Sequence, residues 1–301
     1  MMLREVEIGW GWEVYVEMFA AGVAAGAFLI AMLLEIYGRG RSPIARAAHV
    51  ITLPLLLVAT VLLIYKLERP ERFWHMVIQS ENIPLPMLKW WSPISIGAWG
   101  LMIFSAFATI SLVDALIARG YLSLGPWRQD NTLHGSRFGI FFAIPAALSA
   151  LFVAGYSGAL LSVTAVPGWE DTIFIAPFFI GVSVATGAGA LLLIEAIRKL
   201  GPIDELESVT TFGAISIAWQ MVLLIILAVS LGGAISFFLS STRAIIAFAM
   251  ATVFALAALA LLFLKLHPSD QLRVGAGGTL ILISGFLFRY AVVMGPQHEI
   301  E

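Results

Sequence analysis

Two glutamates on one long apolar stretch are the residues whose spacing first suggests chemistry. Glu17 and Glu35 lie eighteen residues apart in the sequence. At roughly 3.6 residues per turn this is close to five turns, so both carboxylates fall on one stripe of a helix, roughly 27 Å apart along its axis. Gly22 and Gly26 fall on the opposite side, with the spacing that lets another helix approach closely. One face of this helix is therefore predicted to pack, and the other to carry polar groups.

Glu17 is the stronger candidate because it lies inside a segment long enough to cross a bilayer, where an ionisable group is costly and is by default a functional hypothesis. A carboxylate in a medium of low dielectric constant is harder to ionise, so it can exchange protons near neutral pH. Tyr156, on a later apolar segment, can hold a ligand oxygen through its hydroxyl. The alternatives are a carboxylate bonded to Ser, Tyr or Trp of a neighbouring helix, and a tyrosine that packs between Gly155 and Gly158 with its hydroxyl satisfied.

Three further acidic residues, Glu35, Asp114 and Glu195, lie near the other ends of their apolar segments. Together they are predicted to form the inner part of a proton path. The alternative is a set of ordinary ion pairs at helix ends, namely Glu35 with Arg39, Asp114 with Arg119 or Arg137, and Glu195 with Arg198 and Lys199.

The composition is that of a membrane protein. The chain has 301 residues, of which 60% are hydrophobic and 12% are charged, and the apolar residues form long runs. Charged residues make up about a quarter of an ordinary soluble protein, so we predict an all-α integral membrane protein. A net charge of -2 without a basic tract argues against a nucleic-acid partner. The absence of cysteine excludes disulfides, thiolate metal sites and iron–sulfur clusters within this chain.

Eight apolar segments are long enough to cross a bilayer. The predicted transmembrane helices cover about 13–37, 45–67, 93–118, 136–162, 171–198, 209–239, 243–265 and 272–294. An even number of spans places both termini on one side of the membrane. The loops after helices one, three, five and seven hold ten Lys and Arg residues, and the other side holds seven. This bias predicts a protein of the cytoplasmic membrane with both termini outside the cytoplasm.

The loop at 68–92 is the longest on the predicted outer side. Pro70 suits the first position of a short helix. Its apolar residues are expected to lie at the lipid headgroups, namely Phe73, Trp74, Val77, Ile78, Trp90 and Trp91. Its charged residues then face either a soluble partner or only solvent.

Four segments taken in order resemble one family of membrane proteins. They are WGWEVYVEMFAAGVAAG from Trp10, KLERPERFWHM followed by SPISIGAWGL, AGYSGALLSVTAVPGW around Tyr156, and SGFLFRYAVVMG up to Gly295. Together these segments are similar to the NrfD/polysulfide-reductase membrane-subunit family. The resemblance is strongest over the first four predicted helices and the last one.

This resemblance implies eight helices in two four-helix bundles, which places the bundles at 1–165 and 166–301 of this chain. It implies a subunit that binds a menaquinone-type or ubiquinone-type quinone and no metal. It also implies two partners, a four-cluster-type iron–sulfur subunit and a molybdopterin or tungstopterin catalytic subunit. Electrons would then pass between membrane quinol and an acceptor such as a sulfur compound or nitrite.

The resemblance also places the quinone pocket on residues of the first bundle. Glu17 falls where some relatives carry a pocket histidine, Val14 where some carry an asparagine, and Tyr156 at a pocket tyrosine. Quinol oxidation releases two protons, so we expect Glu17 to exchange a proton and Tyr156 to donate a hydrogen bond to the other ring oxygen. Arg289, in the last motif, is expected to reach the membrane surface or to pair within the protein, with the pocket or an anionic lipid as the alternative.

Histidine usage argues against a haem in this chain. A haem in a helical bundle needs two axial ligands on facing spans, and among the five histidines only His49 lies clearly within a span. Its best partner, His134, precedes the fourth predicted helix. Without haem, the quinone chemistry is expected on the same side as the electron partner. Two other functions remain open, a proton-translocating or transport module and a passive structural anchor.

Overall fold

The computed structural model describes residues 10–67, 69–78, 89–129, 131–199, 203–263 and 271–299. The helices, in chain order, are α1 (Trp12–Ile36), α2 (Pro43–Lys66), the 3₁₀ helix η1 (Pro70–Met76), α3 (Pro93–Ala118), α4 (Arg137–Ser162), α5 (Ile175–Arg198), α6 (Ile203–Leu231), η2 (Gly232–Ala234), α7 (Ile235–Leu239), α8 (Thr242–Phe263), α9 (Gln271–Met294) and η3 (Pro296–Glu299). Eight spans in these ranges are long and apolar enough to cross a membrane, with α6, η2 and α7 forming one of them. The prediction of an all-α integral membrane protein with eight spans is confirmed.

Four of the spans, α2, α3, α4 and α8, begin with the same local device. A serine precedes each helix, and its hydroxyl accepts a hydrogen bond from a backbone N–H three residues later. At Ser42 and Ser92 the next residue is proline, whose fixed φ suits the first helical position. The Ser–Pro pair explains why α2 begins at Pro43 rather than near residue 45.

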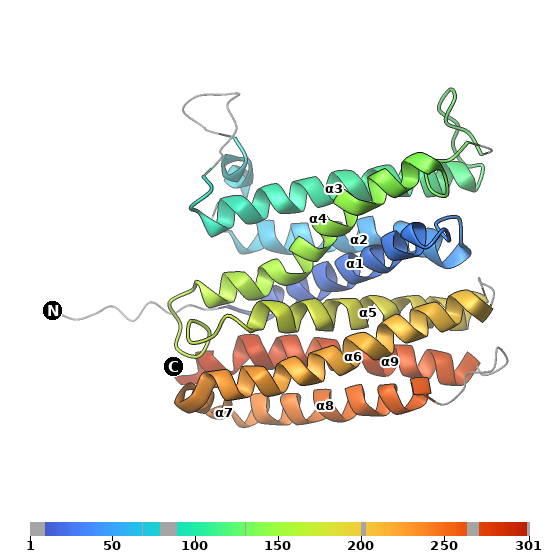
Figure 1. Ribbon diagram of the computed structural model, residues 1–301. Coiled ribbons are helices and arrows are strands. Elements are labelled where there is room, and N and C mark those ends of the chain that lie inside the picture. The colour runs from blue at the N-terminus through green and yellow to red at the C-terminus, as the bar shows by residue number, and fades with distance from the viewer. Residues whose placement is uncertain are drawn as a thin grey trace.

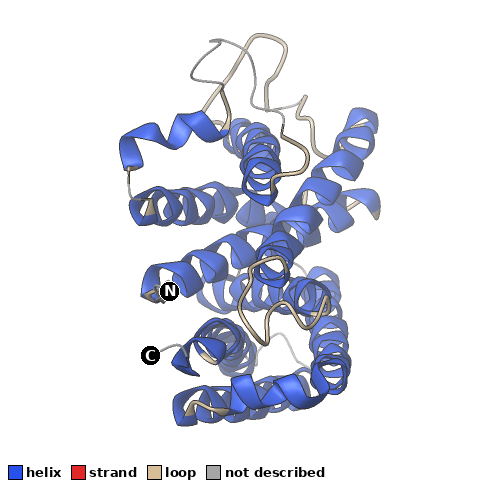
Figure 2. Ribbon diagram, turned by 90° about the vertical axis from the view of Figure 1, so that its left-hand side faces the viewer, coloured by secondary structure: helices blue, strands red, loops and turns tan. Residues whose placement is uncertain are grey.

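The helices lie side by side in an elongated array (Figures 1 and 2). The two ends of the described chain meet at one end of this array, where the Trp10 N–H donates to the Gln297 side-chain oxygen at 3.1 Å. The prediction that both termini share one side is consistent with this contact. Helices α1 and α5 are the most buried spans, and they pack against each other as well as against their neighbours in sequence. The division into bundles at 1–165 and 166–301 stays a prediction.

Glycines bring α1 and α5 into backbone contact. A Cβ atom on Gly26 would overlap the carbonyl oxygen of Ser183, and one on Gly187 would overlap the α1 backbone at Gly26. Gly22 faces the side chains of Ser183 and Arg289. The predicted packing face of α1 is therefore confirmed, because Gly22 and Gly26 let α5 and α9 approach closely.

The predicted short helix in the long loop begins at Pro70 as expected, although it is a 3₁₀ helix. Trp90 and Trp91, just before α3, are 79% and 65% exposed, which suits residues at a membrane surface. Residues 68 and 79–88 of this loop lie outside the described ranges. The placement of the loop at the headgroups stays a prediction.

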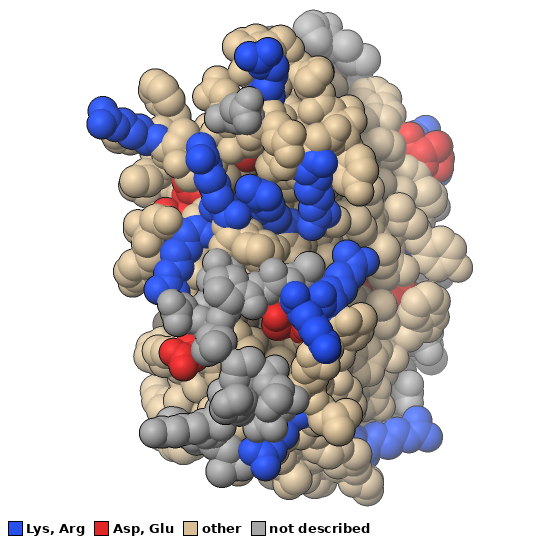
Figure 3. All heavy atoms as spheres, turned by 90° about the vertical axis from the view of Figure 1, so that its right-hand side faces the viewer, with Lys and Arg blue, Asp and Glu red and all other residues tan. Residues whose placement is uncertain are grey.

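Basic residues gather at the end of the array opposite the termini (Figure 3). The nine described there are Arg39, Arg41, Arg46, Arg119, Arg128, Arg137, Arg198, Lys199 and Arg273. Five described basic residues lie at helix ends or in connections at the other end of the array, namely Lys66, Arg69, Arg72, Lys89 and Arg243. Arg289 was one of the seven basic residues counted on this side, but it is buried between helices and so is not a charge of a loop. We use these two ends, the terminal end and the basic end, as reference points below.

Candidate functional site

The polar stripe of α1 faces α4. Towards the terminal end, Glu17 lies within electrostatic range of Tyr156 on α4. Towards the basic end, the Glu35 carboxylate fills the space beside Gly139, at the start of α4. Since α1 and α4 run antiparallel, the two ends of α4 lie beside the two carboxylates. Glu17 and Glu35 therefore lie on the same side of α1, as predicted, and they belong to two separate sites.

Glu17 has an unusual environment for a membrane carboxylate. Its side chain is partly buried, and it makes no hydrogen bond or ion pair with any residue that the structure describes. It lies within electrostatic range of Arg289 on α9, but the two side chains form no ion pair. An unpartnered carboxylate at this depth is costly unless something binds it. Val14, one turn nearer the terminal end, is partly buried and packs against the hydrophobic core.

Tyr156 makes its own contacts inside the first half of the chain. Its hydroxyl donates to the carbonyl of Pro93 at 2.8 Å, and its ring occupies the space left by Gly97 on α3. Phe152 stacks on it, with ring centroids 5.5 Å apart. The hydroxyl is thus satisfied as a donor by the Pro93 carbonyl. The ring packs at Gly97 of α3, and not between Gly155 and Gly158 as the alternative expected. Its oxygen can still accept a hydrogen bond.

Arg289 had two expected positions, at the membrane surface or paired within the protein. The first is wrong, because the side chain is completely buried, and the second agrees with the structure. Its guanidinium donates to Ser183 Oγ at 2.8 Å and lies 5.5 Å from the centre of the Phe179 ring. The Nε–H has no hydrogen-bond partner among the described residues. The SGFLFRY motif gave a hint, since a charge between aromatic residues on an apolar helix needs a buried partner.

The basic end of the stripe is organised around Asp114 and Glu35, both almost completely buried. Asp114 accepts hydrogen bonds from Trp127 Nε1 at 2.6 Å and from two backbone N–H groups, those of Leu133 at 2.6 Å and His134 at 3.1 Å. The alternative pairing with Arg119 or Arg137 does not occur. Asp114 instead holds the α3–α4 connection in place.

Glu35 is bound to the same connection. It accepts a hydrogen bond from the Gly135 N–H at 2.8 Å, and its other oxygen lies 3.4 Å from Nδ1 of His134. His134 stacks face to face on His49, with ring centroids 4.3 Å apart and an angle of 12° between the planes. Rings stacked in this way do not point their nitrogens at each other across a haem iron. His49 and His134 are therefore not arranged as the two axial ligands of a haem.

Glu195, the third residue of the predicted proton path, is buried near the end of α5. In the described ranges, α5 supplies none of the groups that bond to Glu35 or His134. The structure thus joins Glu35 to Asp114 through His134 and leaves Glu195 on another helix. No group of three or more His, Asp or Glu side chains in the described part of the chain is arranged to hold a metal ion.

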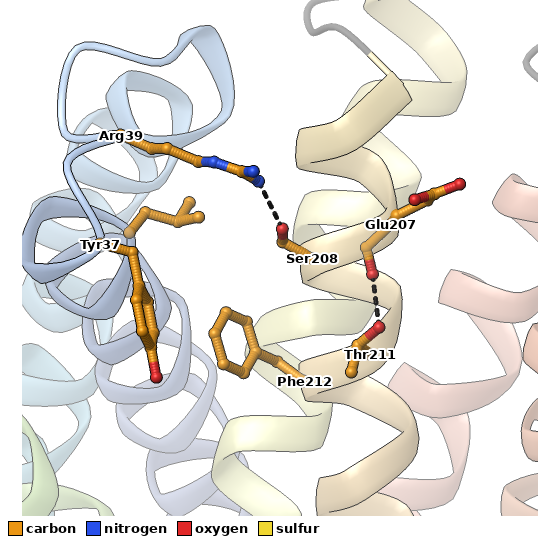
Figure 4. A pocket seen from close by; sticks show the side chains of 7 residues that line it. Tyr37, Arg39, Glu207, Ser208, Thr211 and Phe212 are labelled. Carbon is orange, nitrogen blue, oxygen red and sulfur yellow. Dashed lines mark hydrogen bonds between the residues drawn. The ribbon is translucent and has the colours of Figure 1, made fainter.

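Two cavities are candidates for an organic ligand. One, of about 360 Å³, lies between α3 and α4, is lined by Trp90, Ile96, Trp99 and other apolar residues, and reaches Phe152 beside Tyr156. A larger crevice of about 570 Å³ lies at the basic end between α1 and α6 (Figure 4). There Arg39 donates to Ser208 at 2.7 Å. Neither Glu17 nor Tyr156 lines either cavity. The smaller one lies nearer to the polar stripe, because its lining residue Phe152 stacks on Tyr156.

Comparison with known families agrees with this picture. The family described as polysulphide reductase, NrfD, matches residues 4–301, which is almost the full sequence. The chain belongs to the NrfD polysulphide reductase family, as its four motifs predicted. No curated protein matches the sequence. Members of this family are membrane subunits of oxidoreductase complexes, are associated with quinone-linked complexes, and typically pair with iron–sulfur and catalytic subunits.

Proposed function

We propose that this chain is a quinone-reactive subunit that exchanges electrons between membrane quinol and an iron–sulfur partner subunit. The observation that supports it most directly is the Glu17 carboxylate, which lies in a transmembrane helix of an NrfD-family protein without a hydrogen-bond partner in the described ranges. Such a group fits a ligand that carries hydroxyl protons. A bound quinol supplies two electrons and two protons when it is oxidised.

Glu17 acts in this proposal as the proton acceptor. A carboxylate that accepts a hydrogen bond from a ligand hydroxyl is placed to take its proton as electrons leave. Arg289, within electrostatic range, stabilises the negative charge of Glu17 before the transfer. Once Glu17 is protonated, its charge no longer balances Arg289, which favours release of the proton towards the terminal end.

Tyr156 positions the ligand from α4. Its hydroxyl already donates to Pro93, so the phenol oxygen is available as an acceptor for a second hydroxyl group. This differs from the donor role expected from the sequence. Val14 supplies an apolar wall one turn from Glu17. The apolar cavity between α3 and α4, which reaches the Phe152 ring stacked on Tyr156, is suited to an isoprenoid tail.

The proposed partners dock at the terminal end. His49 and His134 are not arranged to hold a haem that could carry electrons across the membrane. In this proposal electrons therefore leave the quinone site at the terminal end, where Glu17 and Tyr156 lie. The exposed residues of η1 and the tryptophans before α3 lie at this end and are available to a soluble partner. We propose an iron–sulfur subunit of the four-cluster type, joined to a molybdopterin or tungstopterin subunit. The basic end then faces the cytoplasm, as the distribution of Lys and Arg favours.

The test is quinol oxidation by the assembled complex in native membranes with an artificial electron acceptor. Glu17→Gln is expected to lower turnover by about 10²-fold or more, the usual effect of losing a general base. Tyr156→Phe is expected to cause a smaller, several-fold loss. Matched controls are Glu170→Gln and Tyr65→Phe, which alter exposed side chains of the same types.

Co-purification of the partner subunits must be intact in each variant for the comparison to count. An assembled Glu17→Gln complex that oxidises quinol at the normal rate would reduce the chain to a passive anchor. Isolation of the chain alone, without iron or quinone and with ion transport in vesicles, would favour the transport alternative.

Proton translocation is a second candidate, because α1 carries a partly buried acidic group, Glu17, towards one end and a buried one, Glu35, towards the other. Of the three predicted residues, Glu35 suits a proton path best. Asp114 is less suited because its carboxylate already accepts three hydrogen bonds. A proton path through Glu35, Asp114 and Glu195 stays a proposal, to be tested by proton release into vesicles during quinol oxidation.

A further inference from the structure

The stacked histidines at the basic end are not used by the proposed quinone chemistry. His49 comes from α2, His134 from the connection before α4, and Glu35 from α1. All three residues are buried, with exposures of 1% for His49, 3% for His134 and 2% for Glu35. They therefore form one polar cluster enclosed by the helices of the first half of the chain.

Several polar atoms of this cluster have no hydrogen-bond partner among the described residues. They are both ring nitrogens of His49, Nδ1 of His134 and one carboxylate oxygen of Glu35. His134 uses its other nitrogen, Nε2, in a contact of 3.1 Å with Ser111 Oγ. His134 Nδ1 and the Glu35 oxygen lie 3.4 Å from each other, so a proton between them would satisfy both. Buried polar atoms are almost always satisfied by protein or by an ordered molecule, so the two His49 nitrogens point to a bound species.

A small cavity next to the rings supplies the room. It has a volume of about 10 Å³ and is lined by His49, His134, Asp114 and residues of the α1–α2 connection. This is close to the least space that holds one water molecule with polar partners around it. Arg41, which also lines the cavity, is exposed, so the cavity lies near the aqueous surface of the basic end.

Two glycines shape the carboxylate side of the cluster. A Cβ atom at Gly40 or Gly139 would occupy the space of the Glu35 carboxyl group. Glycine at both positions therefore leaves the space in which the carboxylate lies against Gly135 and His134.

Only one positive charge fits on the two rings. Imidazoles stacked at 4.3 Å in a buried site repel strongly when both are charged, whereas one imidazolium is stabilised by Glu35. The other charged groups that face the cluster are Asp114 from α3, which bonds to the His134 N–H, Arg41, whose Nε–H donates to the His134 carbonyl, and Arg46 from α2.

We infer that Glu35, His134 and His49 form a single internal site that binds one proton, with one water molecule hydrogen-bonded to a ring nitrogen of His49. The proton comes from the aqueous phase at the basic end, forms an N–H bond on an imidazole ring, and returns by the same route. No other bond changes. This inference does not depend on quinone binding at the terminal end, since none of its residues belongs to that site.

The experiment is a pH titration of the full chain in lipid bilayers, with ¹⁵N-labelled histidine rings observed by solid-state NMR. Single-histidine substitutions assign the signals. His49 and His134 together are expected to take up one proton between pH 9 and pH 5, and a His49 ring nitrogen is expected to show magnetisation transfer from water. Uptake of two protons, or no transfer from water, would overturn the inference.

Variants separate the site from general effects. Glu35→Gln removes the charge that stabilises the imidazolium, so the two rings together are expected to take up less than the one proton of the wild type over the same pH range. Gly40→Ala displaces the carboxylate without removing a titratable group and is expected to give the same loss. Glu207→Gln changes an exposed carboxylate at the same end and is the matched control. In this variant His49 and His134 are still expected to take up one proton. Normal proton uptake in folded Glu35→Gln protein would contradict the inference, and the wild-type proton count tests it even if both cluster variants fail to fold.

Discussion

The two carboxylates of the α1 polar stripe, Glu35 and Glu17, differ in their hydrogen bonding. Glu35 is enclosed by glycines and accepts a hydrogen bond from a backbone N–H. Glu17 has no such bond in the described ranges, and only electrostatic interactions reach it from Arg289 and Tyr156. A carboxylate that is already bound serves an internal function, whereas one without a partner is available to a ligand.

The two ends also differ in the helices that build them. The Glu35 cluster uses groups from α1, α2, α3 and the start of α4. The Glu17 end adds Arg289 from α9, which is held by Ser183 of α5. The Glu17 site therefore depends on contact between the first and second halves of the chain, and the hydrogen bonds of the Glu35 cluster do not. Variants that disturb this contact should affect the two ends unequally.

The largest effect is expected from Gly26→Val, which places a side chain against the Ser183 carbonyl where α1 and α5 touch. Overpacking of this kind costs roughly 1–3 kcal/mol or more, and here the obstacle is rigid backbone. Loss of folded protein, or a much lower midpoint of thermal unfolding, is expected in detergent. Gly233→Val is the control, since its Cβ would meet nothing within 4 Å. Equal stability of the two variants would show that the α1–α5 contact matters little.

Arg289→Gln should come next and should act on the terminal end alone. It removes a charged hydrogen bond to Ser183, which is worth about 1.5–3 kcal/mol, and the positive charge near Glu17. We expect lower thermal stability and lower quinol turnover, with the His49 and His134 proton uptake unchanged. Arg243→Gln, at the same end but exposed, is the control. A change in the histidine titration would mean that the two ends are coupled.

Asp114→Asn should weaken the basic end alone. An amide can accept from some of the three donors, but its own NH₂ group faces N–H groups, so at least one buried donor loses its partner at a cost of about 1–3 kcal/mol. Faster amide hydrogen exchange at Leu133 and His134 is the expected result. Unchanged exchange would show that the α3–α4 connection is held by other contacts.

The smallest stability change is expected for Tyr156→Phe. The variant keeps the ring against Gly97 and loses one hydrogen bond to Pro93, worth about 0.5–1.5 kcal/mol. If Tyr156 also binds the ligand, quinol turnover should fall by more than this small loss of stability explains. A fall in stability with normal turnover would assign Tyr156 to packing only.

Much of the fold could be predicted from the sequence, because long apolar runs and small-residue spacing act locally. The eight spans and the packing role of Gly22 and Gly26 follow from hydropathy and helix periodicity. The same periodicity placed Glu17 and Glu35 on one stripe. The division into two bundles could not be read in this way, since it depends on which helices meet across the middle of the array.

The side-chain partners were much harder to predict. His134 and His49 are 85 residues apart in sequence, and only the fold of the α3–α4 connection stacks their rings. Local spacing instead favoured Glu35 with Arg39, and Asp114 with Arg119 or Arg137. For Arg289 the sequence left open whether the side chain reaches the membrane surface or pairs within the protein. Its burial depends on Ser183 and the space at Gly22, which no sequence pattern connects to it.

The most direct test is the affinity of the intact complex for a quinol analogue, measured for Glu17→Gln and Glu35→Gln side by side. Our account predicts at least a tenfold weaker affinity for Glu17→Gln, about 1.4 kcal/mol, and a change of less than about twofold for Glu35→Gln. Equal affinities in the two variants, or a larger loss for Glu35→Gln, would contradict the assignment of the quinone site to the terminal end.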